Sequence, residues 1–254
     1  MSGLPVLVAL SAVMGLSIFL SMPIVFRKAM GSRTITLLNS AAIGILVFLL
    51  ADLFLDVGPT IYSNPTSSFL ANASDATIFV VAFAACFFVL FFAEHRSRDS
   101  TLSPKGLALV IALAIGFQNL TEGLVFGSSW VAGAVGLTTV VFVGFFLQNI
   151  TEGFPITSPL VGSGERRVGL VATFFLVGGL PTILGGVGGY FYNSATLDLI
   201  FDSLAMGAIL YSIIPMMRVA FRPALPPEAT YLKQRLTYVG ILLGFLVGFT
   251  VNAL

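Results

Sequence analysis

Two similar polar stretches interrupt an apolar sequence: GFQNLTEGLVFG at residues 116–127 and FFLQNITEGFPI at residues 145–156. Both contain the pattern Gln-Asn-x-Thr-Glu-Gly, so each places a glutamate among hydrophobic residues. A carboxylate in such surroundings is energetically costly unless it is protonated, paired or bound to a cation. The repeated pattern therefore predicts a shared role for the two glutamates that offsets this cost.

The composition around these stretches is typical of an integral membrane protein. Hydrophobic residues make up 57% of the 254 residues and charged residues only 9%, and the mean hydropathy is +1.03. Soluble domains contain about 25% charged residues. The sequence contains no polar segment long enough for a separate soluble domain, and its net charge of +1 gives no indication of a nucleic-acid partner. Cys86 is the only cysteine, which excludes an internal disulfide.

We predict a single all-α transmembrane domain over residues 1–254, with eight membrane-spanning helices. A helix needs about 20 mainly apolar residues to cross a bilayer. The predicted helices cover residues 4–26, 35–57, 75–93, 106–127, 131–158, 168–192, 197–217 and 236–253. The first is expected to be a retained helix and not a cleaved signal, because no basic residue precedes its apolar run.

The basic residues predict the orientation of these helices. All 12 Lys and Arg residues fall in alternate connections between the predicted helices. They are Arg27, Lys28 and Arg33; Arg96, Arg98 and Lys105; Arg166 and Arg167; and Arg218, Arg222, Lys233 and Arg235. Because short basic loops stay in the cytoplasm, we expect both termini outside and the plasma (inner) membrane as the location.

The two polar stretches are expected to meet near the middle of the membrane. The fourth and fifth predicted helices are joined by a short turn, predicted within GSSWVAG (127–133), and are therefore antiparallel neighbours. Within each motif the Gln and the Glu are four residues apart and share one helix face. The side chains of Gln118, Glu122, Gln148 and Glu152 are thus predicted to converge.

A divalent cation between these side chains would balance the two negative charges. Carboxylate and amide oxygens are ligands for hard divalent ions, and Asn119 and Asn149 supply further amide oxygens beside them. We expect the helices to loosen at Gly123, Gly153 and Pro155 and to expose backbone carbonyls to a cavity. The alternative is that the polar side chains only form hydrogen bonds between helices, although this role does not require the same spacing twice.

The motifs resemble those of the ZIP (Zrt-, Irt-like protein) family of divalent-metal transporters. The fourth helix of that family typically carries His-Asn-x-x-Glu-Gly, and the fifth carries a related His/Gln-x-x-Pro-x-Glu block. This chain has QNLTEG (118–123) and QNITEG (148–153) in the corresponding helices. The stretches VGGLPTILGGVGGY and AMGAILYSIIP are similar to the sixth and seventh helices of the family. The resemblance covers the whole chain.

This resemblance implies a three-plus-two-plus-three arrangement, in which helices one to three and six to eight form an inverted repeat around a central pair. It implies that the Gln and Glu side chains of both motifs are the ligands of the transport site. Asn119 and Asn149 would belong to a second, adjoining site. A homodimer is also implied.

Three features differ from the family pattern. Gln118 replaces a histidine of the fourth helix, and the only histidine, His95, is expected in the loop before that helix. Thr182 is nearest to the position of a glutamate in the family's sixth helix, and the loop before the fourth helix lacks a long His-rich segment. An all-oxygen ligand set suits Mn²⁺ and Fe²⁺ as well as Zn²⁺. No prosthetic group is expected.

Four further acids lie near the outer ends of the second and seventh predicted helices: Asp52, Asp56, Asp198 and Asp202. Together they predict an acidic vestibule that concentrates cations. For Asp56 and Asp198 we favour the alternative that they are solvated residues at helix ends. For Asp52 and Asp202, a role in the cation pathway and a structural role are both open.

The sequence therefore predicts transport of a divalent metal cation (Zn²⁺, Fe²⁺ or Mn²⁺) into the cytoplasm, without enzymatic activity. The main alternative is a ZIP-like membrane protein that binds metal or acts as a scaffold without transporting it. An intramembrane enzyme is least favoured, because the membrane segments contain no His ligand and the chain has no HExxH-type signature.

Overall fold

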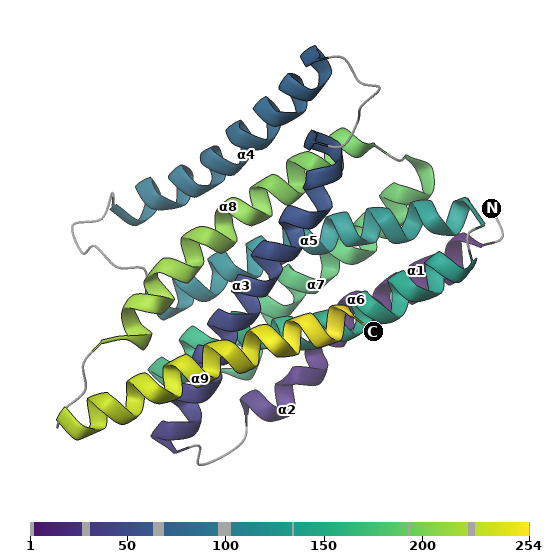
Figure 1. The fold of residues 1–254 in the computed structure, drawn as a ribbon. Coiled ribbons are helices and arrows are strands. Elements are labelled where there is room, and N and C mark those ends of the chain that lie inside the picture. The colour runs from purple at the N-terminus through teal and green to yellow at the C-terminus, as the bar shows by residue number, and fades with distance from the viewer. Residues whose placement is uncertain are drawn as a thin grey trace.

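The computed structural model describes residues 3–26, 31–62, 69–95, 103–133, 135–192, 194–222 and 227–253. Helices and short connections account for these residues, and no strand occurs among them. Most of the long helices run side by side in one bundle, with α4 at its edge (Figure 1). The predicted all-α class is confirmed.

The helices follow the predicted apolar segments. In chain order they are α1 (Leu4–Leu16), the 3₁₀ helix η1 (Ser17–Ser21), α2 (Met22–Val25), α3 (Ser32–Tyr62), α4 (Phe69–His95), α5 (Pro104–Val131), α6 (Val135–Ser163), α7 (Val168–Phe191), α8 (Ala195–Ala220) and α9 (Pro227–Asn252). In the described part of the chain, seven helical segments are long and apolar enough to cross a membrane: α1 with η1, α3, α4, α5, α7, α8 and α9. The protein is therefore an all-helical membrane protein, and the count of eight spans stays a prediction.

Several helices are longer than the predicted membrane-spanning segments. α5 continues to Val131, so most of the expected turn GSSWVAG is helical, and the chain reverses at Ala132 and Gly133, where Gly133 has a φ of 66°. α9 begins at Pro227, which places Lys233 and Arg235 inside a helix and not in a loop. The backbone of His95 is also helical, at the end of α4. In each case the helix extends beyond the apolar segment that hydropathy marks.

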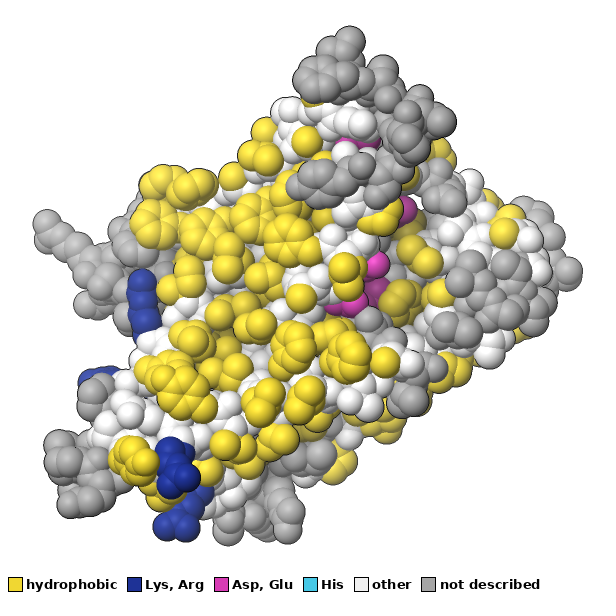
Figure 2. Space-filling model, in the orientation of Figure 1, with side chains coloured by type: hydrophobic (Ala, Val, Ile, Leu, Met, Phe, Trp, Pro, Cys, Tyr) yellow, Lys and Arg dark blue, Asp and Glu magenta, His cyan; other side chains and the backbone are white. Residues whose placement is uncertain are grey.

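The described basic residues lie at one end of the bundle. Lys105, near the start of α5, forms an ion pair of 3.2 Å with Glu165, which follows α6. Arg166 donates a hydrogen bond to the carbonyl of Val25 at the end of α2, and Lys233 of α9 donates to the carbonyl of Val219 near the end of α8. Figure 2 shows Lys and Arg side chains at this end and Asp and Glu side chains toward the other. Arg27, Lys28, Arg96 and Arg98 lie outside the described residues.

Glycines bring α5 and α7 into close contact. A Cβ atom on Gly123 would collide with the carbonyl of Thr182, and one on Gly127 would collide with the carbonyl of Gly186. Only residues without side chains permit this approach, which membrane helices use because lipid gives no hydrophobic drive for association. The expected loosening of the helices is wrong, because α5 and α6 stay helical through Gly123, Gly153 and Pro155.

Candidate functional site

The two motifs meet between α5 and α6, as the sequence predicts. Asn119 donates hydrogen bonds from Nδ2 to Asn149 Oδ1 at 2.8 Å and to Glu152 Oε2 at 3.0 Å. Gln148 donates from Nε2 to Glu122 Oε1 at 2.7 Å. The Gln, Asn and Glu side chains of both motifs are at most 6% exposed. The two carboxylates are therefore buried together in one polar cluster.

A single amide group connects the two carboxylates. Gln148 Nε2 lies 2.7 Å from Glu122 Oε1 and 3.4 Å from Glu152 Oε1. Gln118 Nε2 adds a further hydrogen bond of 3.1 Å to Glu122 Oε1. The amide N–H groups neutralise only part of the two negative charges, because an amide carries no full positive charge. A cation or a proton is required to balance the rest.

Several acceptor oxygens of the cluster have no hydrogen-bond partner among the described residues. They are Gln118 Oε1, Asn119 Oδ1, Glu122 Oε2 and Gln148 Oε1. Leaving a buried acceptor unsatisfied costs about 1–3 kcal/mol, and more for a charged group. Carboxylate and amide oxygens are ligands for Mg²⁺, Ca²⁺ and Mn²⁺ and are accepted by Zn²⁺ and Fe²⁺. The cluster thus offers unused oxygen ligands of the kind that the sequence predicts.

A cavity of about 260 Å³ opens beside Gln118 and Glu122. We call it the acidic cavity, because Asp52, Asp56, Asp198 and Asp202 also line it. Its other described lining residues are Leu53, Val57, Thr60, Thr121, Val125, Phe145, Ala195 and Leu199. They come from α3, α5, α6 and α8. The structure thus brings the four predicted vestibule acids to the same cavity as Gln118 and Glu122.

Asp52 and Asp202, the two candidate pathway residues, differ in their surroundings. Asp202 is only 5% exposed, whereas Asp52 is half-buried and Asp56 is exposed. Asp202 lies close to Thr121 of α5, and its Oδ1 has no partner in the described structure. Glu152, by contrast, is outside the described lining of the cavity. Of the two glutamates, only Glu122 faces the acidic cavity.

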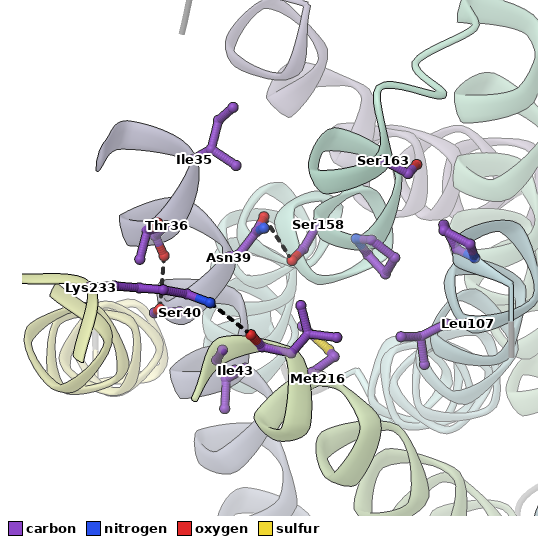
Figure 3. Close-up of a pocket in the computed structure, with 14 residues that line it drawn as sticks. Ile35, Thr36, Asn39, Ser40, Ile43, Leu107, Ser158, Ser163, Met216 and Lys233 are labelled. Carbon is purple, nitrogen blue, oxygen red and sulfur yellow. Dashed lines mark hydrogen bonds between the residues drawn. The ribbon is translucent and has the colours of Figure 1, made fainter. Parts of the chain in front are cut away.

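A second cavity, of about 400 Å³, lies toward the basic end of the bundle. We call it the hydroxyl cavity, because Thr36, Ser40, Ser158 and Ser163 line it together with Asn39 and Lys233. In Figure 3, Asn39 of α3 and Ser158 of α6 face each other, joined by a hydrogen bond of 3.1 Å. Sequence reasoning missed this cavity, although Asn39 and Ser158 are polar residues within predicted membrane segments.

An apolar layer separates the two cavities. Leu46, Leu49, Ile111, Ile115 and Ile156 are at most 1% exposed and belong to one hydrophobic cluster. On α5, Leu107 lines the hydroxyl cavity and Gln118 lines the acidic cavity. At about 1.5 Å per residue, the two are about 16 Å apart along the helix. The layer therefore lies between the buried polar cluster and the hydroxyl cavity.

The described carboxylates do not form a metal cluster of the usual kind. No group of three or more His, Cys, Asp or Glu side chains in the described part of the chain is placed to hold a metal ion. Any cation bound here therefore needs the amide oxygens as well as the carboxylates. Thr182, nearest to the family's sixth-helix glutamate, is fully buried, and the described residues offer its Oγ1 no hydrogen-bond partner.

The fold and the site together define a class, an all-helical membrane protein with a buried pair of glutamates bridged by amides. No protein-family model matches the sequence, and no curated protein is significantly similar to it. The likeness to the ZIP family therefore rests on the motifs and their positions alone.

Proposed function

We propose that the protein transports a divalent metal cation of the zinc, iron or manganese class across the membrane and into the cytoplasm. Glu122 and Glu152 supply the charge that holds the ion, and Gln118 and Gln148 complete its coordination with amide oxygens. Asn119 donates hydrogen bonds to Glu152 and to Asn149 and so helps to hold Glu152 in position. The assignment of the Gln and Glu side chains as ligands follows the ZIP-like motifs.

One observation carries the proposal: two buried carboxylates share a single amide, and Gln118 and Glu122, which each keep an acceptor oxygen without a described partner, line a cavity. If the polar side chains only formed hydrogen bonds between helices, this role would explain neither the oxygens without a partner nor the acids around the cavity. A cation with two positive charges matches the two carboxylates and accepts the free oxygens as ligands.

Gln148 is suited to switch between two states of the site. In the structure its Nε2 donates to both glutamates, and its Oε1 is buried without a described partner. Rotation of the terminal amide by half a turn would exchange the positions of nitrogen and oxygen. The same side chain then bridges the glutamates when the ion is absent and coordinates the ion when it is present.

The helix contacts support the three-plus-two-plus-three arrangement. If the two halves are related by a two-fold axis in the membrane plane, contacts must occur in matched pairs. α3 packs on α9 and α4 on α8; α5 packs on α8 and α6 on α3; α5 packs on α7 and α6 on α1. Replacing α1, α3 and α4 by α7, α8 and α9, and α5 by α6, turns the first contact of each pair into the second. This comparison counts α6 as a membrane-spanning helix in addition to the seven above.

The position of the basic residues supports the predicted orientation of the helices in the membrane. The start of α1 lies at Trp130, at the end of α5 opposite Lys105, so the N-terminal residues lie at the end away from the basic side chains. α9 likewise ends opposite its basic first turns. The positive-inside rule then gives a cytoplasmic basic end and both termini outside. The acidic cavity faces the outside, from which the cation enters.

Uptake by the purified full-length protein in liposomes tests this function. We expect saturable uptake of Zn²⁺, Mn²⁺, Fe²⁺ or Co²⁺ in competition with one another, and its loss in Glu122→Gln and Glu152→Gln. Glutamine keeps the size of glutamate and removes only its charge, so both variants should still be extracted as folded protein. Undiminished uptake in these variants would refute the assigned roles.

The apolar layer favours one second candidate, a protein that binds metal without transporting it. The layer leaves no open route between the two described cavities. Equilibrium metal binding by the purified protein without any flux into liposomes would support this candidate against the transporter.

A further inference from the structure

We propose that the hydroxyl cavity binds a fatty acid anion, a single-chain amphiphile with a carboxylate head, from the adjoining leaflet of the membrane. The carboxylate lies at Lys233, and the alkyl chain extends between the helices toward the apolar layer. This binding claim stands apart from the proposed function and rests on it only for the effect of the ligand on transport.

Lys233 brings an unpaired positive charge to this cavity. It lies within the candidate membrane span Ala229–Val251 of α9, where a charge is costly unless it is paired. In the part of the chain that the structure describes, no carboxylate pairs with it, and the ion pair found there joins Lys105 to Glu165. Its ammonium donates to two backbone carbonyls at the end of α8, at 3.1 and 2.9 Å. An ammonium has three N–H donors, so one remains for an anion.

The other polar groups of the cavity favour a negative head over a positive one. The described lining contains no Asp or Glu. The oxygen of Asn39 accepts from Ser158 at 3.1 Å, and no described hydrogen bond uses its amide nitrogen, which carries two N–H donors. In Figure 3, Asn39 and Lys233 lie on one side of the cavity and Leu107 lies on the other. The cavity thus offers unused N–H donors, which bind anions.

The rest of the cavity suits a hydrocarbon chain. Ile35 lies in the first turn of α3 and Ile43 lies further along the same helix, and both line the cavity. At about 1.5 Å per residue, the cavity follows α3 for about 12 Å. Ile43, Leu107 and Met216 border it from three helices and are at most 7% exposed. A charged group toward the basic end and apolar side chains further inside match the two parts of an amphiphile.

The charge of the lining selects a carboxylate over a phosphate. Lys233 is the only Lys or Arg in the described lining, which therefore balances one negative charge. A fatty acid anion carries one, whereas a phosphate monoester carries about two at neutral pH. In the proposed orientation the cavity lies on the cytoplasmic side of the apolar layer, so a bound fatty acid would obstruct the release of a transported cation.

Equilibrium binding of radiolabelled decanoate tests the site, with the purified full-length protein in liposomes of neutral lipid and protein-free liposomes subtracted. We expect saturable binding of one decanoate per chain. Decanol has the same chain without a charge, and at equal concentration in the membrane it should compete at least about tenfold more weakly, since a hydrogen bond to a charged group is the stronger kind. Acetate, which has the head without the chain, should not compete.

Two variants of α9 test the role of the charge. Lys233→Gln should weaken decanoate binding at least about tenfold and leave decanol binding unchanged. Arg235→Gln is the matched control, because it removes the same charge from a neighbouring position outside the described lining. Arg235 is exposed, and its guanidinium lies 5.6 Å from the centre of the Tyr231 ring. We expect this variant to bind decanoate as the wild type does.

Two further variants leave Lys233 in place. Ile35 is half-buried and lines the cavity, so the larger side chain in Ile35→Trp should fill the space and exclude both decanoate and decanol. Asn39→Asp adds a negative charge to the lining and should weaken the binding of decanoate alone. Thermal unfolding of the ligand-free variants checks that they fold. These two variants keep the inference testable if Lys233→Gln, which loses its bonds to α8, does not fold.

The outcomes separate this inference from the proposed function. Equal affinity for decanoate and decanol, or undiminished decanoate binding in both Lys233→Gln and Ile35→Trp, would overturn the site. In metal uptake, decanoate should lower the maximal rate of the wild type more than that of Ile35→Trp, and equal rates would overturn the effect on release. Lys233-dependent decanoate binding without metal uptake would support the site and contradict transport. Metal uptake without saturable decanoate binding would do the reverse.

Discussion

The two cavities on either side of the apolar layer differ in charge, and the difference gives the proposed cation path a direction. The acidic cavity has Asp52, Asp56, Asp198, Asp202 and Glu122 in its lining. The described lining of the hydroxyl cavity contains hydroxyl groups, one amide and Lys233, but no Asp or Glu. A cation is attracted strongly to the first cavity and weakly to the second. One side is suited to capture and the other to release.

The hydrogen bonds of the hydroxyl cavity strengthen this contrast. Ser158 donates to Asn39 Oδ1, Ser40 donates to the carbonyl of Thr36, and Lys233 donates to the carbonyls of Val219 and Arg222. These polar groups therefore already have partners, whereas Gln118, Glu122 and Asp202 keep oxygens without a partner among the described residues. An ion gains less from groups that must first break other bonds. We infer that the hydroxyl cavity does not retain cations.

Breaking the layer between the cavities should give the largest effect. Ile156 is fully buried in this layer, and Ile156→Ala should lower the free energy of unfolding by about 2–5 kcal/mol, because it leaves a void that its neighbours fill only in part. Denaturation in detergent measures this loss. Leu184→Ala is the control, since Leu184 of α7 is 68% exposed. Equal losses in the two variants would mean that the layer is not tightly packed.

An added acid should make the hydroxyl cavity more like the acidic one. Asn39→Asp keeps the shape of the side chain and its acceptor oxygen for Ser158 but adds a negative charge. If the bound ion then gains about 1.4 kcal/mol, its release slows about tenfold. Uptake rates at saturating metal measure this change.

Ser163→Asp is the control for this variant. Ser163 lines the same cavity but is exposed at the end of α6, where water weakens the attraction. We expect a change of less than about twofold there, since exposed charge pairs contribute little. An unchanged uptake rate in Asn39→Asp would place the release route outside the hydroxyl cavity.

The sequence predicted the features that follow from local spacing. A Gln and a Glu four residues apart must share a helix face, and Gln118 does bond to Glu122. Two helices with a short connection must be antiparallel neighbours, and the two motifs do meet through Asn119 and Asn149. These inferences hold because a helix fixes its own geometry without help from the rest of the fold.

Features that depend on contacts between distant segments were not predictable. Gly123 was expected to loosen α5, but it allows close contact with Thr182 and Gly186 of α7, about 60 residues away. The two sequence motifs are also so similar that they gave no basis for distinguishing the two glutamates. Asn119 donates a hydrogen bond to Glu152, while Glu122 lines the cavity and keeps one oxygen without a partner among the described residues. Only the packing of α3 and α8 around α5 distinguishes the two.

The smallest effect is expected at the mouth of the acidic cavity. Asp56 is exposed and lines this cavity, so it attracts ions from solution without holding them. Asp56→Asn should raise the KM for metal about two- to fivefold at low ionic strength, a change in the range measured for exposed charges, and should leave the maximal rate unchanged. The shift should fade as salt increases, because the Debye length falls from about 30 Å at 0.01 M to about 8 Å at 0.15 M. Asp75→Asn, which removes the same charge outside the described lining, should change KM less. A lower maximal rate that persists in high salt would show instead that Asp56 binds the ion directly, and the division between a capturing mouth and the deeper pair of glutamates would then disappear.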